Sequence, residues 1–396
     1  MKKYFYPLIE NPYRNSDIIK AIKVLKTKKL TIGPQTDKFE KTFTKKLKSN
    51  FSLMVNSGSS ANLLALQCLI NPYRKKRLKA GDEVLIPSLC WSTSLWPIIQ
   101  SGLKPKFVDV DLDTLNINLD DLKKKISKRT KAILVVHVLG NCTNMDELIK
   151  IKKSNKLILI EDTCESLGTK YKNKYLGTFG EFSSFSFYSS HQISSGEGGM
   201  ISCKNLDDYE ILRSLRAHGW SRGLKNEKKI ALANRHLDKR FIFYNSGFNL
   251  RSTDIAASIG LNQFKDLDKF IKYRTKNRNK IVKHFNGSKK IASSIKIICE
   301  NKSVKASWFG MPILLSKNIN RNRFLDKIEA LGVETRPIIS GNFLKQPSIK
   351  KYKLNTKLKY KNSDIINDQG FFIGLPTSNL STVKIKKLVS IFEKNL

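Results

Sequence analysis

Residues 183–199 hold the densest run of side chains able to do chemistry. They read Ser-Ser-Phe-Ser-Phe-Tyr-Ser-Ser-His-Gln-Ile-Ser-Ser-Gly-Glu-Gly-Gly, a predicted strand followed by a hydroxyl-rich loop and a glycine turn. His191 lies in that loop, and its imidazole is expected to have a pKa near neutrality, suited to proton transfer. A lone histidine is more often structural than catalytic, so the loop by itself leaves the chemistry open.

Two further segments place polar groups at turns. Gly58, Ser59 and Ser60 follow a predicted strand and open a helix, where backbone N–H groups and hydroxyls can cradle a phosphate. Asp162 comes just after the buried strand 157–160, at the edge where open α/β sheets place ligands, and its carboxylate can hold a pyridine nitrogen protonated. Glu165 is expected to point into the same site. The structural alternatives are an ordinary strand–helix connection and an acidic helix cap.

These segments belong to an alternating pattern of strands and helices, which predicts an α/β fold with a mostly parallel sheet. The predicted strands are 52–55, 83–87, 106–110, 132–138, 157–160, 183–187 and 200–203. The predicted helices are 61–70, 93–101, 145–154, 207–218 and one long pattern over 254–285. Most strands are continuously apolar, as expected when both faces are covered. We expect a large domain at residues 1–264 and a smaller C-terminal domain at 265–396.

Composition narrows the function classes. The 396 residues carry a net charge of +40, which suits a polyanionic partner, but the lysines are spread along the chain without a nucleic-acid-binding motif. A compositional bias or a cleft for an anionic sugar nucleotide explains the charge equally well. We therefore expect no nucleic acid and, because the apolar runs are short, no membrane span. The predicted location is the cytoplasm.

The six cysteines are scattered, without a Cys-x-x-Cys or Cys-x-Cys pair. Such spacing favours buried thiols over a zinc or iron–sulfur site. We therefore expect no metal.

Taken together, these segments resemble the DegT/DnrJ/EryC1/StrS sugar aminotransferase family. The resemblance runs from Gly33-Pro34 through residues 56–62, 161–165 and 186–199 to the Gly-Phe-Asn-Leu-Arg motif at 247–251 and Thr-Arg-Pro at 335–337. It implies the type I (aspartate aminotransferase) fold of enzymes dependent on pyridoxal 5'-phosphate. That fold has a large, mostly parallel seven-stranded sheet and a smaller C-terminal α+β domain.

The resemblance also assigns roles to individual residues. It implies a cofactor-binding set made up of Gly58, Ser59, Ser60, Trp91, Asp162, Glu165, Ser186 and Asn249. In this set Trp91 stacks on the pyridine ring, Asp162 pairs with the ring nitrogen, and Asn249 reaches the cofactor phosphate across a homodimer interface. Arg336 is the candidate for binding an anionic substrate group, because a guanidinium can bind a carboxylate or phosphate with two hydrogen bonds.

The family has a lysine five residues before the Gly-Glu-Gly-Gly turn, and this chain has His191 there. An imidazole cannot form the covalent bond that a lysine amine forms with the cofactor aldehyde, but it can still transfer protons. A branch of the family carries histidine at this place and removes the C3 hydroxyl of GDP- or CDP-linked 4-keto-6-deoxyhexoses. Its members often have a second histidine next, where this chain has Gln192, so the role of that neighbour stays open.

The resemblance therefore implies a 3-dehydratase of deoxysugar and O-antigen biosynthesis that uses pyridoxamine 5'-phosphate, with His191 as its catalytic residue. Glutamate is the expected amino donor, and the active sites are expected to be shared between two subunits. The alternatives are a sugar-nucleotide aminotransferase, a catalytically idle sensor or binding protein with this fold, and a nucleic-acid-binding protein. An aminotransferase would need another lysine to enter the site.

Overall fold

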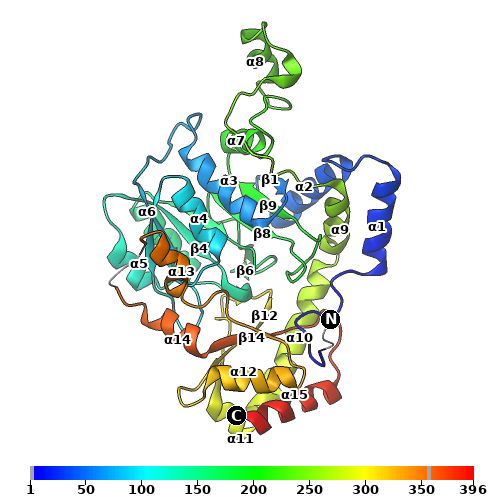
Figure 1. Cartoon of the computed structure of the whole chain (residues 1–396), viewed down its shortest axis with the longest axis vertical. Helices are drawn as coiled ribbons and strands as arrows, with labels where there is room; N and C mark the ends of the chain where they lie inside the picture. The colour runs from blue at the N-terminus through cyan, green and yellow to red at the C-terminus, as the bar shows by residue number, and fades with distance from the viewer. Residues whose placement is uncertain (1–3, 355–357) are drawn as a thin grey trace.

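A seven-stranded sheet forms the centre of the larger part of the molecule (Figure 1). The computed structural model describes residues 4–354 and 358–396. In spatial order the strands are β1 (Phe51–Val55), β9 (Gly199–Cys203), β8 (Phe182–Ser186), β5 (Ile158–Asp162), β4 (Thr130–Val136), β2 (Glu83–Pro87) and β3 (Lys104–Val108). The five strands from β8 to β3 are parallel, and β9 runs antiparallel to both neighbours. The predicted mostly parallel sheet is confirmed.

The strands β2, β8 and β9 are buried at every position, as expected for strands covered on both faces, although β8 carries three serines. Strands β3 and β4 begin and end two residues earlier than predicted, because Val110 and Val138 leave the sheet but remain buried. Val138 opens a short 3-10 turn, η1 (Val138–Gly140). An apolar run therefore marks burial more reliably than it marks strand pairing.

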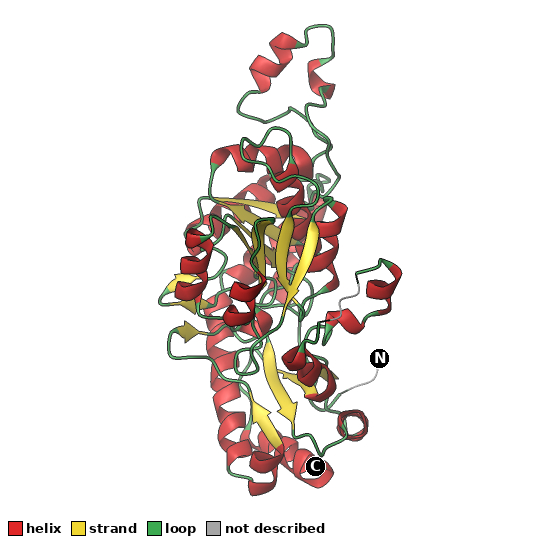
Figure 2. Ribbon diagram, turned by 90° about the vertical axis from the view of Figure 1, so that its left-hand side faces the viewer, coloured by secondary structure: helices red, strands yellow, loops and turns green. Residues whose placement is uncertain are grey.

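Helices cover both faces of this sheet (Figure 2). The first seven are α1 (Asn15–Lys26), α2 (Pro34–Leu47), α3 (Gly58–Ile70), α4 (Ser92–Gln100), α5 (Leu119–Lys125), α6 (Met145–Ser154) and α7 (Leu206–Arg216). The long helical pattern predicted over 254–285 is wrong as one helix: it is broken into α9 (Asp254–Phe264) and α10 (Leu267–Asn286). The break lies at Asp266, whose carboxylate accepts a hydrogen bond from Arg14. Helix α10 then leads to a second sheet.

The second sheet is antiparallel and has the order β10 (Ile295–Ile297), β12 (Gly310–Leu315), β14 (Gly370–Gly374) and β13 (Thr335–Arg336). Around it and in the connections lie α11 (Lys289–Ser294), α12 (Arg321–Ala330), η3 (Phe343–Lys345), α13 (Pro347–Lys351), α14 (Lys361–Gln369) and α15 (Thr382–Asn395). The N-terminal segment also packs here, because the Tyr6 hydroxyl donates to the Gly374 carbonyl at 3.0 Å. The division at 264/265 remains a prediction.

Three short strands form a separate sheet, in the order β11 (Val304–Lys305), β6 (Lys170–Tyr171) and β7 (Lys174–Tyr175). Residues between α7 and α9 form an arm that projects from the top of the molecule in Figure 1 and carries α8 (Glu227–Ala233) and η2 (Lys239–Phe241). In the described part of the chain, every helix is too short or too polar to cross a bilayer.

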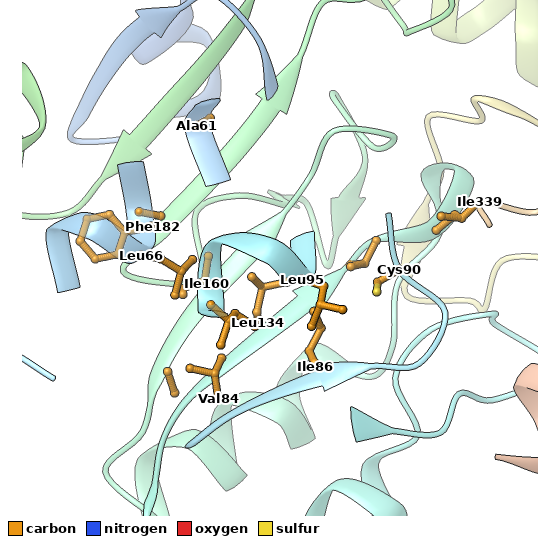
Figure 3. Close-up of a cluster of buried hydrophobic side chains, with 14 of the residues drawn as sticks. Ala61, Leu66, Val84, Ile86, Cys90, Leu95, Leu134, Ile160, Phe182 and Ile339 are labelled. Atoms are coloured by element: carbon orange, nitrogen blue, oxygen red, sulfur yellow. The ribbon is translucent and has the colours of Figure 1, made fainter. Parts of the chain in front are cut away.

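An apolar core fixes the first sheet against α3 and α4 (Figure 3). Leu66 and Leu95 from these helices pack in one cluster with Ile86 and Ile160 from the strands. Ile339, which follows β13, joins the same cluster. This core therefore anchors the starts of α3 and α4 at the end of the sheet where the polar residues gather.

Candidate active site

The start of α3 is a serine-lined turn directly after β1. Ser57 caps the helix by accepting a hydrogen bond from the Ser60 backbone N–H at 3.1 Å, and the Ser60 hydroxyl donates to Asn56 Oδ1 at 2.6 Å. The Ser59 hydroxyl lies 2.8 Å from Thr93 Oγ1 at the start of α4. The turn thus presents backbone N–H groups at a helix N-terminus, which favours an anion such as phosphate, while the Ser60 hydroxyl is used within the turn.

Gly58 lets this turn approach two neighbouring strand ends. A Cβ at position 58 would lie 2.7 Å from both Ser186 Cβ and Cys164 Sγ, closer than carbon and sulfur atoms pack. Ser186 is the last residue of β8, and Cys164 follows β5. The absence of a side chain at Gly58 therefore brings Gly58 and Ser186, both predicted as phosphate-binding residues, into contact.

Asp162 is the last residue of β5, rather than the first residue after the strand, and its side chain is buried. Its Oδ2 accepts hydrogen bonds from Asn62 Nδ2 at 2.8 Å and Ser94 Oγ at 2.7 Å, and Oδ1 accepts from the Cys164 backbone N–H at 3.2 Å. These donors fix the orientation of the carboxylate. A carboxylate held in one orientation suits a charge-assisted hydrogen bond with a protonated pyridine nitrogen.

Trp91 precedes α4 and stays 57% exposed although it belongs to a segment that is otherwise mostly buried. The two residues that hold α4 at the site, Thr93 and Ser94, follow it within three positions and bond to Ser59 and Asp162. An exposed planar ring at the start of the helix that bonds to Ser59 and Asp162 suits stacking on a pyridine.

His191 lies half-buried in the loop after β8. Its Nδ1 is 2.7 Å from the Cys164 carbonyl oxygen. A carbonyl only accepts, so Nδ1 carries the proton and Nε2 keeps its lone pair. Burial, with a smaller contribution from the charge of Arg274, lowers the pKa of His191 to about 4. The expectation of a near-neutral pKa is therefore wrong: the imidazole is a neutral base at pH 7.

Two residues beside His191 are also buried or half-buried. Glu165 Oε2 accepts a hydrogen bond from the Leu139 N–H at 2.9 Å, and burial, aided by the charge of Asp162, raises the pKa of Glu165 to about 7. The Gln192 amide donates to the backbone carbonyls of Glu165 and Ser307. Gln192 thus ties the His191 loop to its surroundings.

Asn249 and Arg336 lie outside this set of contacts. Asn249 is exposed and accepts a hydrogen bond from Arg251 Nε at 3.0 Å. The neighbouring Leu250 carbonyl accepts from the Asn56 N–H, so this segment runs beside the phosphate-binding turn. Arg336 is exposed on β13, 3.3 Å from Glu334.

Sequence reasoning missed the groups that orient Asp162 and His191. Asn62 and Ser94 are buried polar residues near the starts of two largely apolar helices, and this contrast was a usable signal. No sequence signal could have identified the Cys164 carbonyl, because every residue type has a backbone carbonyl. A cavity of about 330 Å³ borders His191, and Lys269 is the one lysine among its described lining residues. Among residues 4–354 and 358–396, His, Cys, Asp and Glu side chains form no group of three placed to hold a metal.

Comparisons with known proteins agree with this geometry. The DegT/DnrJ/EryC1/StrS aminotransferase family matches residues 13–393. The chain is 36% identical to GDP-4-keto-6-deoxy-D-mannose 3-dehydratase of Escherichia coli O55:H7 over 374 residues, covering 93% of this chain and 95% of that protein.

Two solved structures are similar to this chain over nearly its whole length. One is the E. coli GDP-4-keto-6-deoxy-D-mannose-3-dehydratase with bound hydrated PLP, with a TM-score of 0.91, 35% identity and coverage of 99% of this chain and 100% of that chain. The other is a GDP-4-keto-6-deoxymannose-3-dehydratase with a trapped PLP-glutamate geminal diamine, with a TM-score of 0.90, 35% identity and coverage of 98% and 100%. Because the family match spans residues 13–393 and the relatives are similar over nearly their whole length, the protein belongs to the DegT/DnrJ/EryC1/StrS aminotransferase family.

Proposed function

We propose that the protein is a 3-dehydratase that removes the C3 hydroxyl of a nucleotide-linked 4-keto-6-deoxyhexose in deoxysugar and O-antigen biosynthesis, using pyridoxal and pyridoxamine phosphate. The observation that carries the proposal is the neutral imidazole of His191, held by the Cys164 carbonyl in the place where the family has a lysine. Sugars linked to GDP are the first substrates to test, because the similar proteins named above are GDP-4-keto-6-deoxy-D-mannose 3-dehydratases.

The described residues fit the cofactor. The α3 turn at Gly58 and Ser59, together with Ser186, would hold its phosphate, and Asp162 would pair with its ring nitrogen. Trp91, with more than half of its surface exposed, would cover one face of the ring. Glu165, whose raised pKa favours a protonated carboxyl below pH 7, would donate a hydrogen bond to the cofactor.

When bound, the cofactor supplies a primary amine that condenses with a ketone and a ring that delocalises negative charge. His191 would accept a proton at Nε2, while the Cys164 carbonyl keeps the Nδ1 proton in place and the ring oriented. The protonated His191 could then deliver that proton to the departing C3 hydroxyl. Asp162 would stabilise positive charge on the ring nitrogen throughout.

Without a lysine at position 191, the protein has no amine at this place to keep the product bound. The unsaturated amino sugar left by loss of the C3 hydroxyl would be released, tautomerise to its imine and react with water to give a 3-deoxy-4-keto sugar and ammonia. Glutamate would restore the amine form of the cofactor, in line with the PLP-glutamate species in a similar enzyme. Asn249 would complete the phosphate site of a second subunit, and Arg336 would bind an anionic group of the substrate.

The experiment incubates the protein with pyridoxal phosphate, glutamate and either GDP-4-keto-6-deoxymannose or CDP-4-keto-6-deoxyglucose, followed by mass spectrometry and NMR of the sugar. A 3-deoxy-4-keto sugar with release of ammonia is expected. A 4-amino sugar that keeps its C3 hydroxyl would instead identify an aminotransferase.

A further inference from the structure

Arg274 is a buried arginine on α10 that contacts the His191 loop. Arg274 is only 5% exposed. Its two terminal nitrogens donate hydrogen bonds to the backbone carbonyls of His191 and Trp308, both at 3.3 Å. Trp308 directly precedes Phe309, whose ring lies 5.1 Å from the His191 ring. One guanidinium therefore binds the backbone that carries the imidazole and the backbone that carries its aromatic neighbour.

The charge of Arg274 is not neutralised nearby. Among the described residues no carboxylate lies within ion-pair distance of Arg274, and burial lowers its pKa to about 10, which leaves the guanidinium charged at neutral pH. Arg278, one turn further along α10, is equally buried, but it lies 3.7 Å from Glu300 and bonds to the Ile298 carbonyl. Burying an unpaired charge costs free energy, so a buried guanidinium without a carboxylate partner points to a functional role.

The surroundings of His191 suggest that reason. The charges that act on His191 are those of Asp162 on β5 and Arg274 on α10, Tyr188 lies in its own loop, and Arg14, Lys269 and Tyr273 line the cavity that borders it. Asp162 attracts a proton to His191, whereas Arg274 and burial oppose protonation. Of these cations Arg274 is the one that binds the His191 backbone, so its charge is held where it offsets that of Asp162.

We propose that Arg274 is a positioning residue: through the carbonyls of His191 and Trp308 it holds the imidazole for proton transfer, and its unpaired charge opposes a second positive charge beside it. The inference rests on the proposed role of His191 as the base. It assigns to Arg274 no contact with substrate or cofactor.

The test compares Arg274→Gln and Arg274→Lys with the control Arg278→Gln. The titration of His191 is followed by NMR in protein labelled at its five histidines, with His191→Asn identifying the signal, and kcat for dehydration is measured against pH. In Arg274→Gln the midpoint of His191 and the acid limb of kcat should both move up by about one pH unit, with kcat at its optimum falling roughly tenfold or more. Arg274→Lys keeps the charge but not the two-pronged contact, so kcat should fall while the midpoint stays.

An unchanged His191 midpoint in Arg274→Gln would overturn the electrostatic part. A loss of kcat no larger than that of Arg278→Gln would overturn the positioning part. If Arg274→Gln does not fold, Arg274→Lys decides alone, because wild-type kcat in that variant contradicts positioning by the guanidinium. If the wild-type protein dehydrates no sugar nucleotide, the proposed function fails, while the NMR comparison still tests the effect of Arg274 on His191.

Discussion

At the scale of residues, the chemistry depends on one substitution and on backbone groups that complete it. His191 replaces a lysine, and the Cys164 carbonyl turns the histidine into a base with a defined tautomer. The low pKa of His191 and the raised pKa of Glu165 have one main cause, burial, which disfavours the charged form of each. At neutral pH the site therefore combines a neutral base with a carboxyl close to its titration midpoint.

Replacing His191 by lysine should cause the loss of dehydration and the gain of a covalent bond to the cofactor. In His191→Lys we expect a visible absorbance from a covalent lysine–cofactor bond and loss of most dehydration. Borohydride treatment followed by peptide mass spectrometry should label residue 191 in the variant and no lysine in the wild type. A label on Lys269 of the wild-type protein, or unchanged dehydration by His191→Lys, would contradict the role given to His191.

Glu165 should make stability depend on pH. Its folded-state pKa of about 7 exceeds the ordinary value of 4.5, so the folded protein holds this proton more tightly, and the contribution to stability declines as pH rises from about 4.5 to about 7. Glu165→Gln cannot ionise. Relative to wild type, its unfolding free energy should rise by on the order of 3 kcal/mol between pH 4.5 and pH 7.5, measured by urea unfolding without cofactor. If the variant and the wild type differ in unfolding free energy by the same amount at both pH values, the raised pKa of Glu165 is refuted.

At the scale of elements, the site is assembled where strands end and helices begin. The starts of α3 and α4 are joined by Ser59 and Thr93, and both helices contribute a donor to Asp162 at the end of β5. The contact of α3 with β8 depends on the missing side chain of Gly58. A displacement of α3 would therefore move the serine-lined turn and the donor to the Asp162 carboxylate together.

A methyl group at position 58 should separate these elements. Gly58→Ala would place Cβ 2.7 Å from Ser186 and Cys164, so we expect a loss of about 1–3 kcal/mol in unfolding free energy and weaker cofactor binding. The control is Gly287→Ala at the end of α10, where the nearest atoms lie at 3.4 Å and φ is −73°. Urea unfolding and cofactor titration measure both. Cofactor affinity equal in the two variants would argue against a phosphate site at this turn.

At the scale of the whole molecule, the exposed arm and Asn249 bear on assembly. The arm between α7 and α9 projects beyond the body in both views (Figures 1 and 2). It carries the exposed side chains Leu232, Leu237, Phe241, Phe243 and Tyr244. Exposed apolar groups of this size favour burial against a partner, which supports the prediction of a homodimer with shared sites.

Mixing two inactive variants tests the shared site. His191→Ala and Asn249→Ala are combined and allowed to exchange subunits. If the two residues serve one site from different chains, each mixed dimer holds one intact and one doubly altered site, and random exchange should restore activity to about a quarter of wild type. If both residues act within one chain, every site stays altered and mixing restores nothing.

The sequence by itself determined the order and type of the main strands and helices and the positions of His191 and Asp162, because apolar runs and turn residues act over short distances. It placed the ends of β3 and β4 less well, since a residue can be buried without being paired, and it did not show the break between α9 and α10 at Asp266. Only the tertiary structure decided the state of His191: the carbonyl of Cys164, the guanidinium of Arg274 and the burial that lowers its pKa come from three separate parts of the chain. The type of a residue determines which group can be protonated, but the surroundings of that group determine its protonation state at a given pH.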